Sequence, residues 1–369
     1  MAGRLVMTNS IPCALAIGLG ALLAASPSAC ATFAGYGGPY RLITLPPAEG
    51  GSFGTAGDAL ADGRLITVTG TSIYVETAPG SGSFAFGAAL DSTVIGGAVD
   101  PSFLRVSPDG SRIALGAGIA KPLLIFDTSL ATSGGVIDGA NASVFSVPHF
   151  DAAWRNDGEL AITAGTFGQP SYVSLLDVTS DPMAPSNPTI IDNIGGASAG
   201  VGFDGDGRLY TGNGFDLGPG GSATGWIKAF DPADFLAGPL DFEATGVFVA
   251  DLLSANALEF DAKGNLFVGG GDFDAGDTGS IAIVNAAALA DLFLSGAAID
   301  AGDPSEVRRL DPRGDGFGFY GASYNGATGE VYVTDGGTWY ATIPTPGGLV
   351  LLAGAALAAS VRRRREVRR

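Results

Sequence analysis

The sequence predicts an all-β protein, a β-propeller of six blades, in the long segment between its two ends. Two observations lead to this fold. A glycine-containing turn followed by β-type runs recurs six times, and the recurrences lie roughly 50 residues apart. The composition agrees, because 46% of the 369 residues are hydrophobic and 59 are glycine. Such a chain has enough apolar material for a core, and frequent glycine suits many short strands joined by turns.

Each repeat begins at a turn that contains glycine, and turns in the style of Asp-Gly and Asn-Gly supply positive φ for a tight hairpin. The first repeat has the turn Asp62-Gly63, followed by the β-type runs Leu65–Val68 and Ser72–Val75. The turn glycines of the six repeats are Gly63, Gly110, Gly158, Gly207, Gly264 and Gly329, at spacings of 47, 48, 49, 57 and 65 residues. A repeat of this length with two or more strands indicates a propeller blade.

A single blade cannot bury both faces, so neighbouring blades pack in a ring, and closing the ring protects the end blades. We expect Tyr40–Leu45 to add a strand that completes the last blade. The two longer late spacings leave room for a seventh blade. A β-sandwich and a β-helix are the rival architectures, and the long repeat argues against both. The pattern resembles the NHL, SMP-30 and YVTN propellers, a resemblance of fold that implies no particular activity.

The charge of the chain excludes one class of partner. The formal net charge is −18, and seven of the 19 basic residues lie in the two terminal segments, against one acidic residue there, Glu366. The body between these segments therefore has a net charge near −24. An acidic surface repels phosphate backbones, so we expect no nucleic-acid binding.

Residues 1–31 are typical of a secretory signal peptide. Arg4 gives a positive start, Ile11–Ala25 is apolar, and Ala29-Cys30-Ala31 fits the small-residue cleavage pattern. A permanent membrane helix is an alternative, although the apolar run is shorter than the ~20 residues of a membrane span. A lipidated Cys30 is another. The second cysteine, Cys13, also lies in the signal, so cleavage after Ala31 leaves no thiol in the mature protein.

The C-terminal segment 343–369 has three parts in a fixed order. Ile343-Pro344-Thr345-Pro346 comes first, an uncharged apolar stretch over 347–361 follows, and Arg362-Arg363-Arg364-Arg365 comes last. The apolar stretch suits a membrane helix, and the arginines favour the cytoplasmic side. The prolines break the backbone pattern outside the membrane and present an extended segment to an enzyme. A plain tail anchor is the alternative.

This order resembles the PEP-CTERM sorting signal, whose motif is commonly Val-Pro-Glu-Pro ahead of a short apolar helix and a basic cluster. Ile343, Pro344 and Pro346 match the motif, and Thr345 stands where the motif has Glu; the resemblance covers the last 27 residues. It implies an exosortase-like processing enzyme as a partner. It also implies an exported protein that the C-terminal helix anchors in the membrane until cleavage, and that then lies at the cell surface or outside the cell.

Candidate chemistry in the body, residues 36–342, is sparse. His149 is the one histidine of the chain, and its place between Pro148 and Phe150 favours a structural role over catalysis. The acidic loop 269–277 offers Asp272, Asp274 and Asp277 as calcium ligands, because calcium takes six to eight oxygens, and a solvated acidic turn is the alternative. The segment Phe203–Gly207 looks like part of a calcium loop, but a hairpin turn explains it.

We therefore expect an exported propeller that acts as a non-catalytic binding or scaffold module. Extracellular polysaccharide and surface proteins are its expected partners besides the processing enzyme and the membrane. Calcium is the one cofactor that the acidic loops suggest. The alternative is a metal-dependent, lactonase-like hydrolase that uses the propeller channel, where some six-bladed propellers hold a metal on Glu, Asn and Asp side chains.

Overall fold

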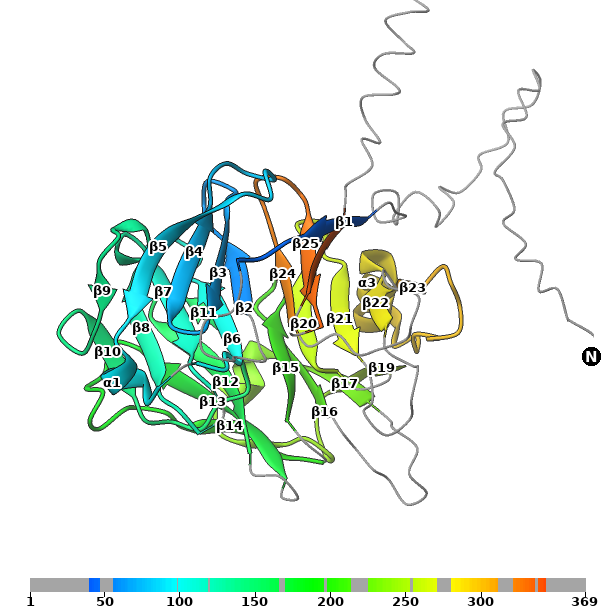
Figure 1. Cartoon of the computed structure of the whole chain (residues 1–369). Coiled ribbons are helices and arrows are strands. Elements are labelled where there is room, and N and C mark those ends of the chain that lie inside the picture. Colours follow the sequence, from blue (N-terminus) through cyan, green and yellow to red (C-terminus); the bar gives the residue numbers. More distant parts are fainter. Residues whose placement is uncertain are drawn as a thin grey trace, which may run out of the picture.

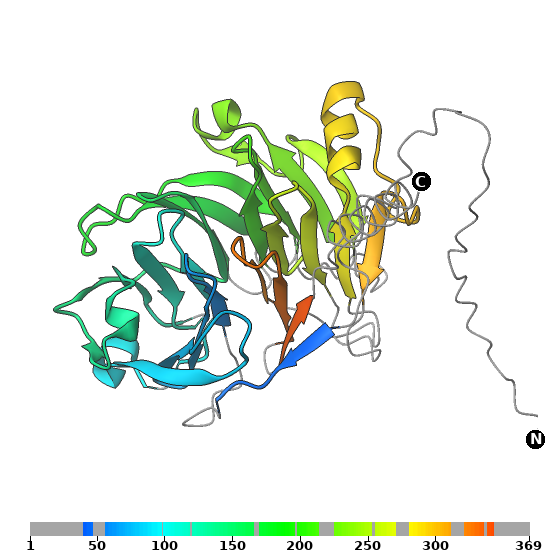
Figure 2. The same cartoon turned by 90° about the horizontal axis from the view of Figure 1, so that it is seen from above.

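The computed structural model describes residues 40–46, 56–97, 99–118, 120–165, 170–195, 198–213, 225–252, 255–270, 280–310, 321–335 and 338–342. In these residues the chain forms six sheets of four antiparallel strands, two of which gain a fifth strand. The sheets follow one another around a common centre, which Figure 2 shows through the colours from cyan to orange. The fold is the six-bladed propeller that the repeats predict.

The first three blades use the first half of the chain (Figure 1). Blade 1 contains β2 (Ala56–Ala59), β3 (Leu65–Thr69), β4 (Ser72–Glu76) and β5 (Phe84–Leu90). Blade 2 contains β6 (Phe103–Val106), β7 (Arg112–Gly116), β8 (Leu123–Asp127) and β10 (Ala142–Phe145). Blade 3 contains β11 (Asp151–Asn156), β12 (Glu159–Ala164), β13 (Ser171–Asp177) and β14 (Thr189–Ile194).

The other three blades complete the ring. Blade 4 contains β15 (Ser198–Phe203), β16 (Leu209–Asn213), β17 (Gly225–Phe230) and β19 (Val247–Leu252). Blade 5 contains β20 (Ala257–Phe260), β21 (Leu266–Gly270), β22 (Ser280–Val284) and β23 (Val307–Leu310). Blade 6 contains β24 (Gly321–Tyr324), β25 (Val331–Thr334), β26 (Trp339–Thr342) and β1 (Tyr40–Ile43).

Two short strands link neighbouring blades. β9 (Val136–Ile137) lies in the chain between β8 and β10 but pairs in parallel with β5 of blade 1. β18 (Leu240–Asp241), between β17 and β19, pairs in parallel with β14 of blade 3. Helical segments in the connections between strands are α1 (Ser92–Ile95), the 3₁₀ turn η3 (Leu130–Thr132), α2 (Pro232–Phe235) and α3 (Ala286–Ser295).

The hairpin turns have the predicted backbone in five blades. Gly63, Gly110, Gly207, Gly264 and Gly329 have φ between +74° and +86°. The expectation is wrong for Gly158, which is absent from the described residues with positive φ. The β11–β12 pairing shifts register between Trp154 and Asn156, and the Asn156 side chain accepts the Gly158 N–H at 2.9 Å. The register shift beside the turn accompanies its different shape in blade 3.

The ring closes through the N-terminal strand, as predicted. β1 pairs with β26 from Tyr40↔Thr342 to Ile43↔Trp339, and the two strands lie side by side in Figure 2. Arg41 of β1 also donates to Glu330 at 3.0 Å. Residues from the two ends of the described chain thus share one sheet, which leaves no unpaired strand edge between β26 and β1.

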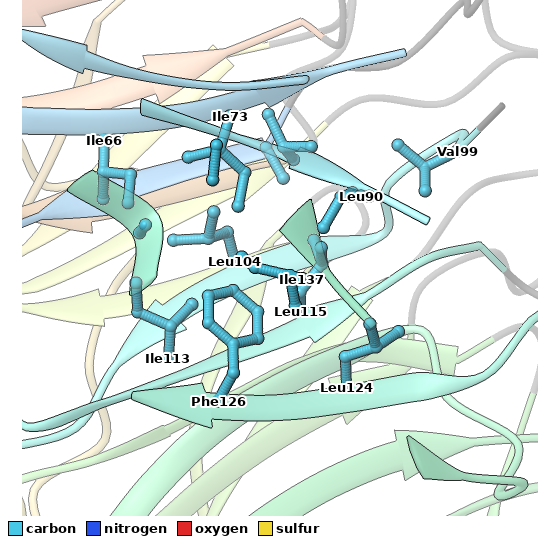
Figure 3. Packing of buried hydrophobic residues seen from close by; sticks show 14 of the residues in the cluster. Ile66, Ile73, Leu90, Val99, Leu104, Ile113, Leu115, Leu124, Phe126 and Ile137 are labelled. Carbon is cyan, nitrogen blue, oxygen red and sulfur yellow. The ribbon is translucent and has the colours of Figure 1, made fainter. Parts of the chain in front are cut away.

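The core lies between the faces of adjacent blades. Figure 3 shows the contact of the first two blades, where Ile66 and Ile73 of blade 1 face Leu104 and Ile113 of blade 2. All four side chains are at most 1% exposed. Alternating apolar positions on each blade supply such contacts because successive strand residues point to opposite faces.

The predicted terminal segments lie outside the described residues. These are the signal peptide 1–31 and the sorting segment 343–369 with its apolar stretch 347–361. Among the helices that the structure describes, none has the length and hydropathy of a membrane span.

Candidate functional site: the channel cavity

The central channel holds a cavity of about 510 Å³. Each of the six innermost strands contributes to its lining: Asp58 from β2, Arg105 from β6, Trp154 from β11, Phe203 from β15, Glu259 from β20 and Tyr324 from β24. Turn residues of the hairpins, such as Ala61, Pro108 and Ala327, also border it. The cavity therefore opens on the face that carries the hairpins between the first two strands of the blades.

A buried arginine joins three blades beside this cavity. Arg105 is 8% exposed, and its Nε and Nη1 donate to the carbonyl oxygens of Ala152 and Ala322, both at 2.7 Å. Its Nη2 donates to Asp151 Oδ1 at 2.8 Å, and Asp151 is 6% exposed. The planar guanidinium suits this fork of acceptors. One side chain of blade 2 thus ties blade 3 and blade 6 together across the channel.

The carboxylates of Asp151 and Asp58 extend this hydrogen-bond network to blades 4 and 1. Asp151 Oδ2 accepts the backbone N–H of Val201 in blade 4 at 3.2 Å. Asp58 of blade 1 accepts the N–H of Val106 in blade 2 at 2.7 Å and the hydroxyl of Ser323 in blade 6. Buried charges of this kind are tolerated when hydrogen bonds satisfy them. The floor of the cavity is accordingly a fixed polar network.

Glu259 of blade 5 differs from these two aspartates. In the part of the chain that the structure describes, the hydrogen-bond partner of its carboxyl is the backbone N–H of Phe260. Burial raises the pKa of Glu259 to about 8; the charge of Arg105 opposes this shift, and those of Asp58 and Asp151 add to it. The side chain is half-buried and lines the cavity. At neutral pH it holds a proton for most of the time.

The raised pKa of Glu259 makes the stability of the fold depend on pH. A carboxyl whose pKa is raised on folding stabilises the fold most below its unfolded pKa, and this contribution is lost as the pH rises through the folded pKa. We expect the free energy of unfolding to fall by roughly 2–4 kcal/mol through Glu259 as the pH rises from about 5 to about 8. Burial also raises the pKa values of Asp58 and Asp151, so Glu259→Gln should make the pH dependence in urea titrations less steep, and Glu243→Gln, at an exposed position, should leave it unchanged. An unchanged slope in Glu259→Gln would contradict the burial of this carboxyl.

His149 has a structural place, as its sequence neighbours suggest. It is 1% exposed, its Nδ1 lies 2.9 Å from the Val147 carbonyl oxygen, and its ring meets Phe103 edge to face at 5.5 Å. Burial lowers its pKa, and the hydrogen bond to Val147 opposes this. It is absent from the cavity lining. No nucleophile–histidine pair is found for it within the described residues.

A neutral buried histidine makes the fold sensitive to acid. Its contribution to stability is present above the unfolded pKa of about 6.5 and is lost as the pH falls. We expect His149→Phe to unfold less steeply with acid than the parent protein below about pH 6.5. Thermal unfolding at a series of pH values measures this. Parallel acid profiles of the two proteins would show that the pKa of His149 is the same in the folded and unfolded states, which would contradict this prediction.

Most site residues suggested by the sequence belong to two segments outside the described residues. Asp272, Asp274 and Asp277 lie outside the described residues, and so do the motif Ile343–Pro346 and the arginines 362–365. The segment at Asp204 is the predicted hairpin turn: Asp204 Oδ1 accepts the N–H groups of Asp206 and Arg208, both at 2.9 Å. In the described residues, no group of three or more His, Cys, Asp or Glu side chains is arranged to hold a metal ion.

Fold and cavity define a class: a six-bladed propeller with a polar network in its channel. No family model matches the chain, and no curated protein matches it. An AA12 carbohydrate-active enzyme of Trichoderma reesei aligns over 82% of this chain and 95% of its own, with 13% identity and a TM-score of 0.55. The PQQ domain of a Coprinopsis cinerea pyranose dehydrogenase covers 83% and 96%, with 12% identity and a TM-score of 0.51.

A gluconolactonase of Xanthomonas campestris covers 85% of this chain and 93% of its own, with 12% identity and a TM-score of 0.50. It supports the resemblance of the body to SMP-30-type propellers at the level of the fold. At these identities the likeness extends to the fold alone.

Proposed function

We propose that the chain is an exported, non-catalytic binding propeller whose channel cavity holds a small molecule. The observation that carries this proposal is the cavity itself. Its volume of about 510 Å³ lies in the usual range of ligand pockets, and its lining combines polar groups with four aromatic residues, Trp154, Phe203, Phe260 and Tyr324. The network around Arg105 fixes the polar floor, so a ligand meets a preformed surface.

A thermal-shift panel of neutral, cationic and anionic small molecules tests ligand binding in this cavity. We expect at least one class to raise the unfolding temperature of the parent protein. Ala61 lines the mouth of the cavity, so Ala61→Trp should reduce that shift. Ala233→Trp on the outer helix α2 is the matched control and should keep it. A panel without any stabilising ligand, or equal shifts in both variants, would contradict binding in the channel.

A hydrolase is the second candidate, and Glu259 is the observation that favours it. With its pKa raised to about 8, this residue holds a proton at neutral pH, as a general acid does. A metal-dependent, lactonase-like mechanism fits the described channel poorly, because the carboxylates of Asp58 and Asp151 face the Arg105 guanidinium where a metal ion would need them. Lactone or ester hydrolysis that Glu259→Gln abolishes would favour the enzyme over the binding module.

We also propose that the segment 343–369 acts as a PEP-CTERM-like sorting signal read by an exosortase-like enzyme. The described fold supports a cut outside the propeller, because β26 ends at Thr342, one residue before the motif. Thr342 is held in the sheet: its Oγ1 accepts the Val331 N–H at 2.9 Å, and its register partner is Tyr40. Cleavage at the motif would leave every strand of the closing blade intact.

Tagging the body and following its size and location tests the sorting proposal. Replacement of Pro344 and Pro346 by alanine should leave a larger, membrane-bound form. Pro304→Ala, in the body of the propeller, is the control and should be processed like the parent. Identical size and location of the motif variant and the parent would contradict the proposal.

A further inference from the structure

The geometry points to a small organic cation as the ligand of the channel cavity: a protonated amine on an apolar body, with its ammonium group against Glu259. This inference rests on the proposed binding function and names its ligand class. Three features support it: the acidic side chains around the cavity, the unused acceptor positions of Glu259, and the aromatic residues of the cavity wall.

The charges around the cavity favour a cation. Two acidic side chains, Asp58 and Glu259, and one basic side chain, Arg105, line the cavity in the described residues. A third acidic side chain, Asp151, does not line the cavity but is hydrogen-bonded to Arg105 at 2.8 Å, and all four groups act electrostatically on one another. The whole chain carries a net charge of −18, which adds a long-range field of the same sign. Such a field raises the local concentration of cations and lowers that of anions.

The single guanidinium of the described cavity lining is mainly engaged by the protein, which uses three of its five N–H donors. Its Nε, Nη1 and Nη2 all donate to protein oxygens at 2.7–2.8 Å, and the residue is 8% exposed. Burial lowers the pKa of Arg105, but the charges of Asp151, Glu259 and Asp58 outweigh this and raise it above its ordinary value. Arg105 therefore stays charged and engaged with the carboxylate of Asp151. An anion in the cavity would meet the remaining acidic side chains.

Glu259 is the carboxyl with acceptor capacity to spare. Asp58 accepts from Ala59 N–H at 2.8 Å as well as from Val106 and Ser323, and Asp151 is bound by Arg105 and Val201. For Glu259 the described partner is the single N–H of Phe260. A carboxylate offers about four acceptor positions, so an ammonium group could take those that the protein leaves unused.

The wall of the cavity suits the rest of such a ligand. Trp154, Phe203, Phe260 and Tyr324 are all half-buried and line the cavity. The Trp154 indole is fixed in place, because its Nε1 donates to the Arg105 carbonyl oxygen at 3.1 Å. Aromatic rings attract organic cations through their π-electrons and also bury an apolar body. The Trp154 ring is thus held in position before the ligand arrives.

Proton release follows from this arrangement. Glu259 holds a proton at neutral pH, and the groups that face it are Asp58 on β2, Arg105 on β6 and Asp151 on β11. An ammonium ligand pairs with the ionised carboxyl, so binding transfers the Glu259 proton to the buffer. Affinity for the cation should rise with pH up to about pH 8 and level off above it.

Isothermal titration of the purified protein with three matched probes tests the inference: phenethylammonium, phenethyl alcohol and phenylacetate. We expect the cation to bind at least about tenfold more tightly than the alcohol and the anion. In buffers of different ionisation enthalpy, its binding at neutral pH should release close to one proton. Glu259→Gln should weaken cation binding by about tenfold or more and abolish proton release, and Glu243→Gln, at an exposed position, should change neither.

The probes separate failure of the inference from failure of the proposed function. Equal or tighter binding of the alcohol or of phenylacetate, sensitive to Ala61→Trp, would overturn the cation inference and leave the cavity as a binding site. Cation binding that Glu259→Gln leaves unchanged would also overturn it. If none of the three probes binds, the cation inference falls, and the wider thermal-shift panel still decides whether the cavity binds a ligand.

Discussion

Arg105→Met is expected to lower the free energy of unfolding by about 3–5 kcal/mol, because it leaves a buried carboxylate without its partner. Asp151 is 6% exposed and would keep the Val201 N–H as a donor, and the carbonyl groups of Ala152 and Ala322 would lose theirs. Since Arg105 of blade 2 connects partners in blades 3 and 6, its loss loosens the contact of three blades. Urea unfolding measures the change.

Arg64→Met is the matched control for this prediction. Arg64 pairs with Asp62 at 2.7 Å, but the two side chains are 31% and 53% exposed. Pairs in solvent contribute little, so the control should lose less than about 1 kcal/mol. Arg105→Lys should fall between the two, because it keeps the charge and loses the planar fork of donors. If Arg105→Met were as mild as Arg64→Met, the channel network would not hold the blades together.

Ile43→Asp is expected to cost about 3 kcal/mol or more, because it buries an unpaired charge in the seam that closes the ring. Ile43 is 2% exposed and packs with Leu65, Tyr332 and Trp339, side chains from blades 1 and 6. The change disturbs the pairing of β1 with β26 and with it the contact between the last blade and the first. Thermal and urea unfolding both report this loss.

The neighbouring position gives a stringent control. Leu42 belongs to the same strand and points to the other face, where it is 60% exposed. Leu42→Asp should therefore stay within about 0.5 kcal/mol of the parent. Equal destabilisation by both changes would mean that the strand as a whole tolerates no charge. Equal tolerance of both would mean that β1 does not close the ring in the observed register.

Most of the blade architecture can be predicted from the sequence. The turn glycines mark the six hairpins, and the β-type runs that follow them are the second and third strands of the blades. The innermost strands are harder to predict. β2 is Ala-Gly-Asp-Ala and β24 is Gly-Ala-Ser-Tyr, sequences with little β-propensity. Pairing with the next strand and contact with neighbouring blades give these segments their form.

The residues of the channel cavity lie on those innermost strands, whose sequences do not have a clear strand pattern. The sequence therefore does not predict the cavity directly. One signal was present: Asp58, Arg105 and Glu259 each precede a turn glycine by five residues, at Gly63, Gly110 and Gly264. This shared position places three charged side chains at the same level of three blades. Asp151 does not follow this rule: in blade 3 the position five residues before Gly158 is Ala153, and Asp151 lies two residues further from the turn. The meeting of these residues depends on ring closure, a property of the whole chain.

The two-residue strands β9 and β18 show a second limit. Neither Val136–Ile137 nor Leu240–Asp241 is long enough to carry a strand pattern, and each exists because an adjacent blade offers an edge. The calcium ligands proposed at Asp272, Asp274 and Asp277 and the sorting segment remain predictions from sequence.

A crystal structure of the protein with phenethylammonium tests binding in the channel most directly. We expect the ligand in the cavity of the hairpin face, with its ammonium group at hydrogen-bond distance from Glu259 and its ring against the aromatic wall of Trp154, Phe203, Phe260 and Tyr324. We also expect the Arg105 network to be unchanged. A ligand bound elsewhere on the propeller, with an empty channel cavity, would contradict both the site and its chemistry.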